Sequence, residues 1–155
     1  MDTRNAELVT RAHMQRVAEL LNTAAMELLR RANAHDLSKL TPQELEPLQR
    51  MQDHIALHGQ APYGTPAYDA QTAMLRDMLA HHYANNSHHP EHYPDGVAGM
   101  DLFDLTEMFF DWKAASERGG ESAMNITAST QKHGLPPMLE SILRNTAARL
   151  GYTAT

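Results

Sequence analysis

Apolar residues recur at helical spacing along most of the chain. From Ala6 to about Arg31 they return every three or four positions, with Arg, Gln and Glu between them, which predicts a helical region. Helical patterns follow over 41–59, 66–86, 101–118 and 137–150. No window of four to eight residues alternates cleanly with β-branched enrichment, so no strand is expected. The sequence therefore predicts an all-α fold of five to six helices.

Capping residues mark several of the helix ends. Thr41 and Glu44 have the spacing of a capping box, in which each side chain bonds the other residue's backbone. Asp101 is a candidate N-cap, and Gly119-Gly120 should end the helix that it starts. The segment 125–137 lies between helical patterns and has no role that the sequence assigns.

The length of 155 residues is that of one ordinary domain, so residues 1–155 are expected to share one core. No stretch reaches the roughly 18 consecutive apolar residues of a membrane span. The N-terminal "MDTRNAELVTRAH" lacks an apolar segment that would mark it for secretion, so a cytoplasmic location is expected. The oligomeric state stays open, with a homo-oligomer as one candidate.

Charge and cysteine content narrow the chemistry. A formal net charge of −6 argues against binding to a nucleic-acid polymer, which requires a basic surface. The chain has no cysteine and ten histidines, so any transition-metal site must consist of imidazole and carboxylate groups. A small anionic substrate is still possible if a bound metal or local Lys and Arg supply positive charge.

The stretch "HHYANNSHHPEHYPDG" over 81–96 contains five of the ten histidines. His82 and Asn86 lie one helical turn apart, and His88 and His89 follow directly. An exposed polar loop would account for this composition, but the histidines are too dense for a helix cap alone. Clustered imidazoles are the usual ligands of divalent Mn, Fe, Co, Ni or Zn, so the loop is a candidate site for one or two such ions.

Three acidic residues, Asp104, Glu107 and Asp111, share one face of the helix predicted over 101–118. They could form a solvated acidic stripe. Asp111, however, lies within "FFDW" among the residues of the buried face and is expected to be half-buried. A buried carboxylate requires a partner or a metal ion, so Asp111 is a candidate ligand.

Two further segments carry candidate ligands. "HDLSK" places an imidazole and a carboxylate at consecutive positions, His35 and Asp36, with Lys39 three residues later. His13 lies on the apolar face of the first helical region, where a single histidine is more often a core residue than a ligand.

A family resemblance adds to this pattern. "HMQRVAELL" followed by "AHDLSK" resembles the opening of the HD-domain superfamily, whose members bind a divalent metal through a His, a His-Asp pair and a distant Asp. More closely, "HDLSK", "HHPEH" and "DLTEMFFDWKAASER" look like an uncharacterised family of small phage and bacterial proteins distantly similar to HD domains. The resemblance implies that the first ion is bound by His13, His35, Asp36 and Asp111, and that His82 and His89 bind a second ion or contact the substrate.

Helix geometry constrains the role of His13. The 22 residues between His13 and His35 would span about 33 Å in one straight helix, so the chain must reverse for both to bind one ion. Asn22-Thr23 offers capping residues for a reversal midway. The uninterrupted apolar stripe favours a later break at Asn33. In that case His13 is a core residue, and the ligands are His35, Asp36, the loop histidines and Asp111.

The main functional hypothesis is a metal-dependent phosphohydrolase that acts on a small phosphorylated substrate, with a nucleotide favoured by the resemblance. In this hypothesis Glu107 orients or deprotonates the attacking water, and His88 protonates the leaving oxygen. The expected substrate contacts are Lys39, Asn86, Lys113 and Arg118. Lys39 and Arg118 could equally serve only as cations near helix C-termini.

Two other hypotheses use the same residues. The superfamily has a branch that binds two irons and oxidises small molecules, and imidazole and carboxylate ligands suit iron as well. A non-catalytic protein could use the histidine loop only to bind metal or a partner protein, without any need for Glu107 or Asp111.

Overall fold

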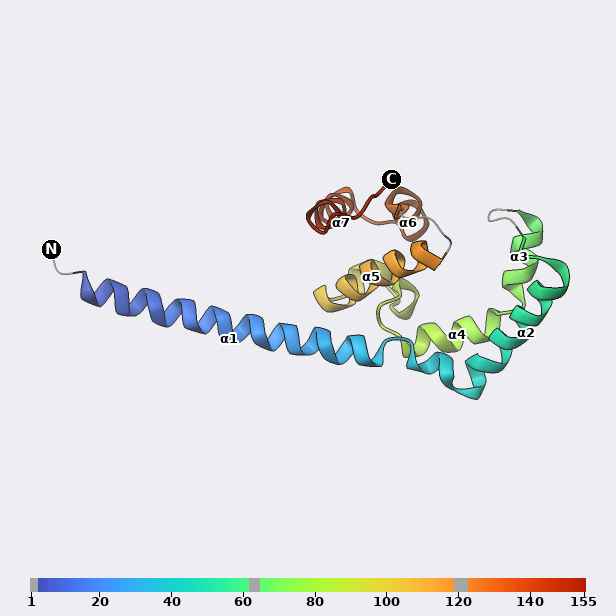
Figure 1. Cartoon of the computed structure of the whole chain (residues 1–155), viewed down its shortest axis with the longest axis horizontal. Coiled ribbons are helices and arrows are strands. Elements are labelled where there is room, and N and C mark those ends of the chain that lie inside the picture. Colours follow the sequence, from blue (N-terminus) through green and yellow to red (C-terminus); the bar gives the residue numbers. More distant parts are fainter. Residues whose placement is uncertain (1–2, 62–64, 119–122) are drawn as a thin grey trace. The chain divides into compact units, whose positions relative to one another are not determined.

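The fold is helical throughout the part of the chain that a computed structural model describes, residues 3–61, 65–118 and 123–155. These residues form seven α-helices and three short 3-10 helices (Figure 1). Within them the β pairing is limited to an isolated bridge between Met124 and Ala154. The predicted all-α class is confirmed, with more helices than the five to six expected. The chain divides into two units, Met1–His35 and Asp36–Thr155. The expectation of a single domain stays a prediction.

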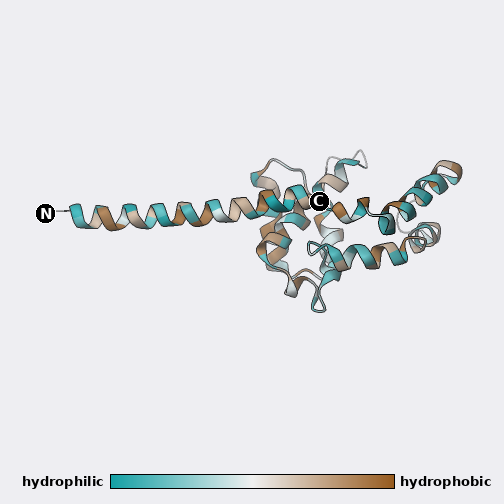
Figure 2. Ribbon diagram, turned by 90° about the horizontal axis from the view of Figure 1, so that it is seen from below, coloured by the Kyte–Doolittle hydropathy of each residue, from teal (hydrophilic) through white to brown (hydrophobic). Residues whose placement is uncertain are grey.

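The first unit consists essentially of α1 (Arg4–Ala34), an uninterrupted helix of 31 residues. The reversal at Asn22-Thr23 is therefore wrong, and the helix continues to Ala34, as the later break predicted. Figure 2 shows hydrophobic and hydrophilic residues interspersed along this helix. His13 and His35 belong to the same straight element, about 33 Å apart, so the two side chains of one chain cannot bind one ion. His13 is exposed rather than a core residue.

Ion pairs between neighbouring turns support α1. Glu27 accepts hydrogen bonds from Arg30 and Arg31 at distances of 2.6 to 3.1 Å. The Arg30 guanidinium, followed by that of Arg31, outweighs the effect of desolvation and lowers the pKa of Glu27 to about 2. Because this pKa is depressed in the helix, the stabilising contribution of Glu27 is present above the ordinary carboxyl pKa.

Acidification is expected to remove this contribution as the pH falls through about 2, where Glu27 takes up its proton in the helix. Far-UV circular dichroism should therefore show a loss of helix for the wild type over the pH range from about 4.5 to 2. The variant Glu27→Gln lacks the titrating group and should lose less helix over this range. An identical pH profile for the two proteins would contradict the assignment.

The second unit contains the other nine helices: η1 (Leu37–Leu40), α2 (Pro42–His58), α3 (Pro66–Ala73), α4 (Arg76–Asn85), η2 (Pro90–His92), η3 (Gly96–Gly99), α5 (Leu102–Arg118), α6 (Ile126–His133) and α7 (Pro137–Arg149). Two features explain why the described residues form more α-helices than predicted. The helix expected over 66–86 is divided at Met74 and Leu75 into α3 and α4. The unassigned segment 125–137 contains α6.

One hydrophobic core lies among the C-terminal helices of this unit. Its buried residues are Phe109, Met124, Ile126, Leu135, Leu143 and Ala147. Phe109 anchors α5 there, while Met108 on the same helix is also fully buried. Elsewhere in the unit, α2, α4 and η1 pack together. The core thus fixes α5, and the second packing group fixes the segments that carry Asp36 and His82.

The predicted caps give one confirmation and one correction. Asp101 caps α5, since its Oδ1 accepts from the backbone N–H groups of Phe103 and Asp104. The capping box of Thr41 and Glu44 is wrong, because the Thr41 hydroxyl donates to the Ser38 carbonyl and Glu44 is fully buried. Gly119-Gly120 lies outside the described residues.

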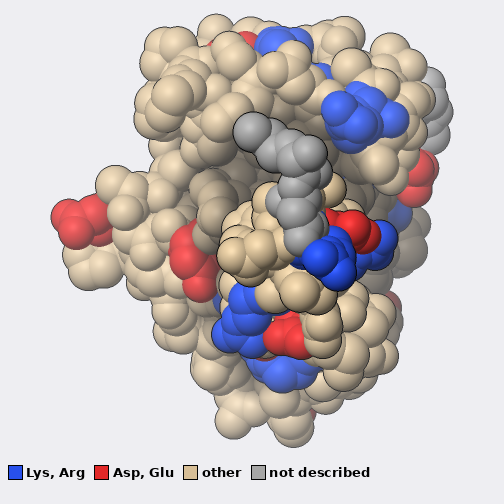
Figure 3. Space-filling model, turned by 90° about the vertical axis from the view of Figure 1, so that its left-hand side faces the viewer, with Lys and Arg blue, Asp and Glu red and all other residues tan. Residues whose placement is uncertain are grey.

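Surface properties agree with the composition. Within the described ranges, no helix has both the length and the apolar character needed to cross a membrane. On the face that Figure 3 shows, positive and negative side chains are intermixed.

Candidate metal centre

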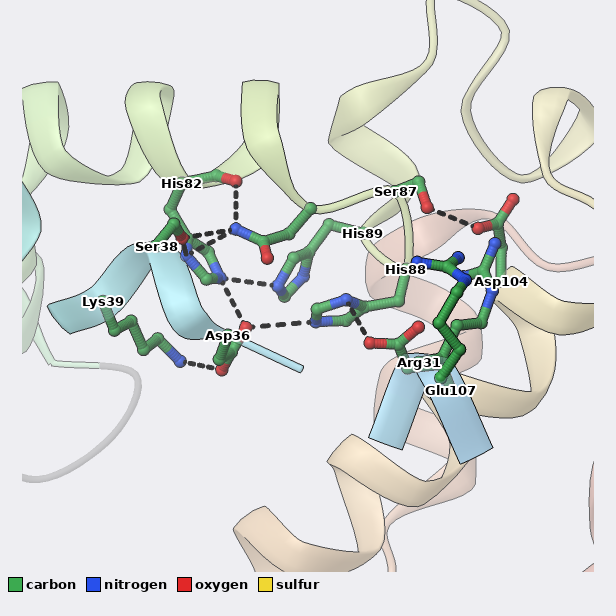
Figure 4. Close-up of polar contacts among 12 residues, drawn as sticks. Arg31, Asp36, Ser38, Lys39, His82, Ser87, His88, His89, Asp104 and Glu107 are labelled. Carbon is green, nitrogen blue, oxygen red and sulfur yellow. Dashed lines mark hydrogen bonds and ion pairs between the residues drawn. The ribbon is translucent and has the colours of Figure 1, made fainter. Parts of the chain in front are cut away.

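Four side chains of the second unit converge on one point (Figure 4). Asp36 lies at the start of η1, His82 lies in the last turn of α4, and His88 and His89 lie in the loop before η2. One nitrogen or oxygen atom from each of the four lies within 4.8 Å of the corresponding atoms of the other three. His82 and His88 are almost completely buried. The histidine-rich stretch is thus a folded part of the protein, not an exposed loop.

The converging atoms are Nε2 of the imidazoles and Oδ1 of Asp36. His82 Nε2 lies 2.9 Å from His89 Nε2 and 3.3 Å from Asp36 Oδ1. His88 Nε2 lies 3.5 Å from the same Asp36 oxygen. Ligands about 2.0–2.1 Å from a common ion are separated from each other by about 2.9 Å at right angles and about 3.4 Å in a tetrahedron. The spacing and the chemistry of these donors therefore fit a divalent transition-metal ion.

Asp36 has an unusual backbone conformation. Its φ of 56° and ψ of 18° place it in the left-handed region, and among the described residues it is the only non-glycine with a positive φ. Asp36 directly precedes η1, of which it is the N-cap residue. Its outer oxygen, Oδ2, accepts from the Lys39 ammonium. Aspartate tolerates this region better than most residues, and strained positions of this kind cluster at functional sites.

A buried carboxylate orients His82. Glu44 Oε2 lies 2.8 Å from His82 Nδ1, and Glu44 Oε1 lies 2.7 Å from His81 Nδ1. Although burial tends to raise the pKa of Glu44, donors from His81, Ser38 and His82 outweigh it and lower the pKa below its ordinary value. The ionised carboxylate can only accept, so His82 carries its proton on Nδ1. Its Nε2 lone pair then faces Asp36.

Asn86 closes this network from the end of α4. Its Nδ2 donates to Ser38 Oγ and to the His82 carbonyl, each at 2.7 Å. These two acceptors use both hydrogens of the amide, so the 3.1 Å approach of the same nitrogen to His82 Nδ1 is a contact between two donors. Asn86 is buried. It therefore supports His82, and its expected contact with the substrate stays a prediction.

His88 and Glu107 form a second pair of this type. Glu107 Oε1, from α5, lies 3.1 Å from His88 Nδ1. The opposite nitrogen, Nε2, is the one near Asp36. This geometry makes His88 a candidate ligand whose ring Glu107 orients. The expected roles of His88 as a proton donor and of Glu107 as a base stay predictions.

His89 is held in the neutral form that metal binding requires. Burial is the main cause, and the neighbouring His88 and His82 add to it, while Asp111 and Asp36 partly oppose it. Together these effects lower the pKa of His89 to about 3. In the metal-free protein His89 Nε2–H can donate to His82 Nε2, and the other tautomer would present both lone pairs to an ion.

Asp104, on the first turn of α5, fixes the loop that carries His88 and His89. This fully buried carboxylate accepts from the hydroxyls of Ser87 and Tyr93, each at 2.6 Å. It also accepts from the backbone N–H of Asp101. Because Ser87 and Tyr93 lie on either side of the two histidines, one carboxylate holds both ends of the segment. Asp104 thus faces the interior, and Glu107 and Asp111 are partly buried, so the three do not form a solvated acidic stripe.

The remaining predicted site residues are not members of the group of four side chains. An Asp111 oxygen lies within 4.8 Å of an Asp36 oxygen. Lys113 pairs with Glu117 at 3.0 Å and lies over the Tyr152 ring. Arg118 is exposed at the end of α5, two turns beyond Asp111. His35 is the C-cap of α1 and directly precedes Asp36, and its role as a ligand stays a prediction.

Two residues of this network, Glu44 and Ser38, were not predicted from the sequence. Glu44 matched a capping box so well that its carboxylate was assigned to the backbone of its own helix. In the sequence, only its residue type marks Glu44 as a candidate, because the neighbouring residues do not show that it packs against α4. Ser38 lies within "HDLSK", between the candidate ligand Asp36 and the candidate substrate contact Lys39. A serine by itself does not indicate a metal centre.

Comparisons with known proteins identify a family. A model described as "Family of unknown function (DUF5662)" matches residues 3–149. No curated protein matches the sequence, and no solved structure matches it. The resemblance to HD domains is not tested by these comparisons and stays a prediction.

Proposed function

The chain belongs to the DUF5662 family, whose function is unknown, and we propose that it is a metal-dependent phosphohydrolase acting on a small phosphorylated substrate. The observation that carries the proposal is the convergence of His82, His88, His89 and Asp36. Carboxylates on the far sides of two of these rings strengthen it. Metal-binding imidazoles commonly donate their other N–H to a carboxylate, which fixes the ring and raises its basicity.

A divalent ion in this centre would lower the pKa of a bound water and offset phosphate charge. The protein's own groups have defined tasks in such a reaction. Glu44 and Glu107 hold His82 and His88 in the ligating tautomer. Lys39, on the outer oxygen of Asp36, is the cation best placed to attract an anionic substrate. Asp111 adds a carboxylate beside Asp36 that could orient a water or accept its proton.

The number of protein donors sets a condition on the metal. Four donors fill a tetrahedral ion and leave no position for water, as in structural zinc sites. Mn, Fe, Co and Ni accept five or six ligands, so four protein donors would leave one or two positions for water and substrate. The proposal therefore favours these metals over tetrahedral zinc.

Metal reconstitution tests the proposal. We expect the metal-free protein to be inactive toward a panel of nucleoside phosphates and other phosphomonoesters and diesters, and to release phosphate or cleave the ester when Mn, Co, Fe or Ni is added. Asp111→Asn should retain the metal and lose most of this activity, with Asp53→Asn, an exposed acid on α2, as its control. Stoichiometric metal without hydrolysis of any tested phosphate would contradict the function but not the site.

An iron oxygenase remains the second candidate, because the proximity of Asp111 to Asp36 leaves room for a carboxylate shared between two ions. Two equivalents of iron, a visible absorption band and oxygen uptake with an organic substrate would favour it over hydrolysis. Metal binding that survives without Asp36 would instead favour a non-catalytic histidine loop.

A further inference from the structure

The adjacent residues His81 and His82 share Glu44 as an unusual common partner. Consecutive residues of a helix point about 100° apart, so they seldom contact the same side chain. Glu44 reaches between them from α2, and each of its oxygens meets one imidazole. The Glu44 side chain is fully buried, that of His82 is 2% exposed, and that of His81 is 38% exposed. The three groups thus form a line from the surface to the candidate metal centre.

A fully buried carboxylate is costly unless several donors satisfy it. Glu44 has donors from His81, His82 and the nearby Ser38. Ser38 in turn accepts from Asn86, which also binds the His82 carbonyl. Glu44 Oε2 lies 2.8 Å from His82 Nδ1, and between an ionised carboxylate and this nitrogen the contact is a hydrogen bond only when Nδ1 carries the proton. The opposite tautomer would place a lone pair against the carboxylate and a proton between Nε2 and Asp36.

We propose that Glu44 is a positioning residue that fixes the Nδ1–H tautomer of His82 and so preforms the metal centre, with His81 as its outer brace. The inference rests on the proposed metal centre but concerns a residue that contacts no candidate ligand atom of that centre. His81 binds the second oxygen and keeps the carboxylate from rotating. Without Glu44, the His82 ring can adopt either tautomer and can rotate. Metal binding is then weaker, because part of its free energy is used to fix the ring in one tautomer and orientation.

Nitrogen-15 NMR of the metal-free wild type is the first test, because imidazole nitrogen shifts report the tautomer directly. We expect His82 to be protonated at Nδ1 and unprotonated at Nε2. Protonation at Nε2 would overturn the proposal. This measurement requires no metal and no activity, so it separates the role of Glu44 from the proposed function.

Cobalt titration is the second test. Glu44→Gln keeps the size of the side chain but replaces one acceptor by an NH₂ donor. We expect it to weaken Co²⁺ binding about 10- to 100-fold and to change the visible Co²⁺ spectrum. The matched control is Glu46→Gln, the same substitution at an exposed glutamate of the same helix, which should bind Co²⁺ like the wild type.

Each outcome distinguishes the two proposals. Equal Co²⁺ affinity and spectra for Glu44→Gln and wild type would overturn the role of Glu44 and leave the metal centre standing. A wild type that binds no divalent metal would overturn the centre, whereas the tautomer would still report on Glu44. If Glu44→Gln does not fold, His81→Ala provides the comparison, with a several-fold weaker Co²⁺ affinity expected from the loss of the brace and an unchanged affinity counting against it.

Discussion

Replacing Asp36 by asparagine is expected to abolish metal binding while the protein remains folded. Asparagine has the same shape and tolerates the left-handed conformation that Asp36 adopts. It lacks the negative charge, however, and its amide nitrogen cannot ligate an ion. Elemental analysis of the purified protein should show about one to two equivalents of metal in the wild type and less than about a tenth of an equivalent in Asp36→Asn.

Two further substitutions distinguish the effect of losing the Asp36 carboxylate from the effect of the left-handed backbone conformation at this position. Asp36→Gly and Asp36→Ala both remove the carboxylate and should lose the metal equally. Glycine adopts the left-handed region freely, whereas alanine pays about 1–2 kcal/mol there. In metal-free protein, urea unfolding should therefore find Asp36→Gly more stable than Asp36→Ala by about 1 kcal/mol. Full metal content in all three variants would refute the centre itself.

Removing the carboxylate of Asp104 is expected to be the most destabilising of these substitutions. Asp104→Ala leaves the hydroxyls of Ser87 and Tyr93 without the acceptor that both use. Burial, together with the hydrogen bond to Asp104, raises the pKa of Tyr93, which is therefore a neutral donor at neutral pH. Leaving such donors unsatisfied costs about 1–3 kcal/mol each, so we expect a loss of about 3 kcal/mol in the free energy of unfolding.

The metal site should be lost in the same variant, because the segment that carries His88 and His89 is then held at neither end. Asp104→Asn is the matched control. It retains one acceptor oxygen, and a hydroxyl can rotate to accept from its NH₂, so its loss should be nearer 1 kcal/mol. Urea unfolding and metal content measured on both variants check the prediction. Equal stability of Asp104→Ala and wild type would show that the loop does not depend on this carboxylate.

Local patterns predicted the helical class and much of the candidate site. Asp36, His82 and His89 were proposed as ligands because their residue types and spacing carry the chemistry, and the structure brings them together. His88 was selected as well, but for a different role. Which ring nitrogen faces the ion depends on a partner elsewhere in the chain, here Glu107, so the sequence could not distinguish a ligand from a proton donor.

Sequence-based predictions were wrong where a local motif suggested one role for a residue and contacts with distant segments of the chain gave it another. Glu44 fits a capping box, but burial against α4 makes the two histidines better partners than the backbone of its own helix. The residue type of Asn86 likewise does not reveal that both of its amide hydrogens are bound by Ser38 and His82. The His13 proposal failed because an unbroken apolar stripe allows a single straight helix, which separates it from His35.

The helical class, the restriction of any transition-metal ligands to imidazole and carboxylate groups, and the short segments that hold these groups all follow from the amino-acid sequence. These properties depend on spacing along the chain and on residue type, both of which are local. Which nitrogens converge, and which carboxylates orient them, depends on how distant segments pack. These choices follow from burial, because a carboxylate withdrawn from water must take its donors from whatever segments the fold packs around it.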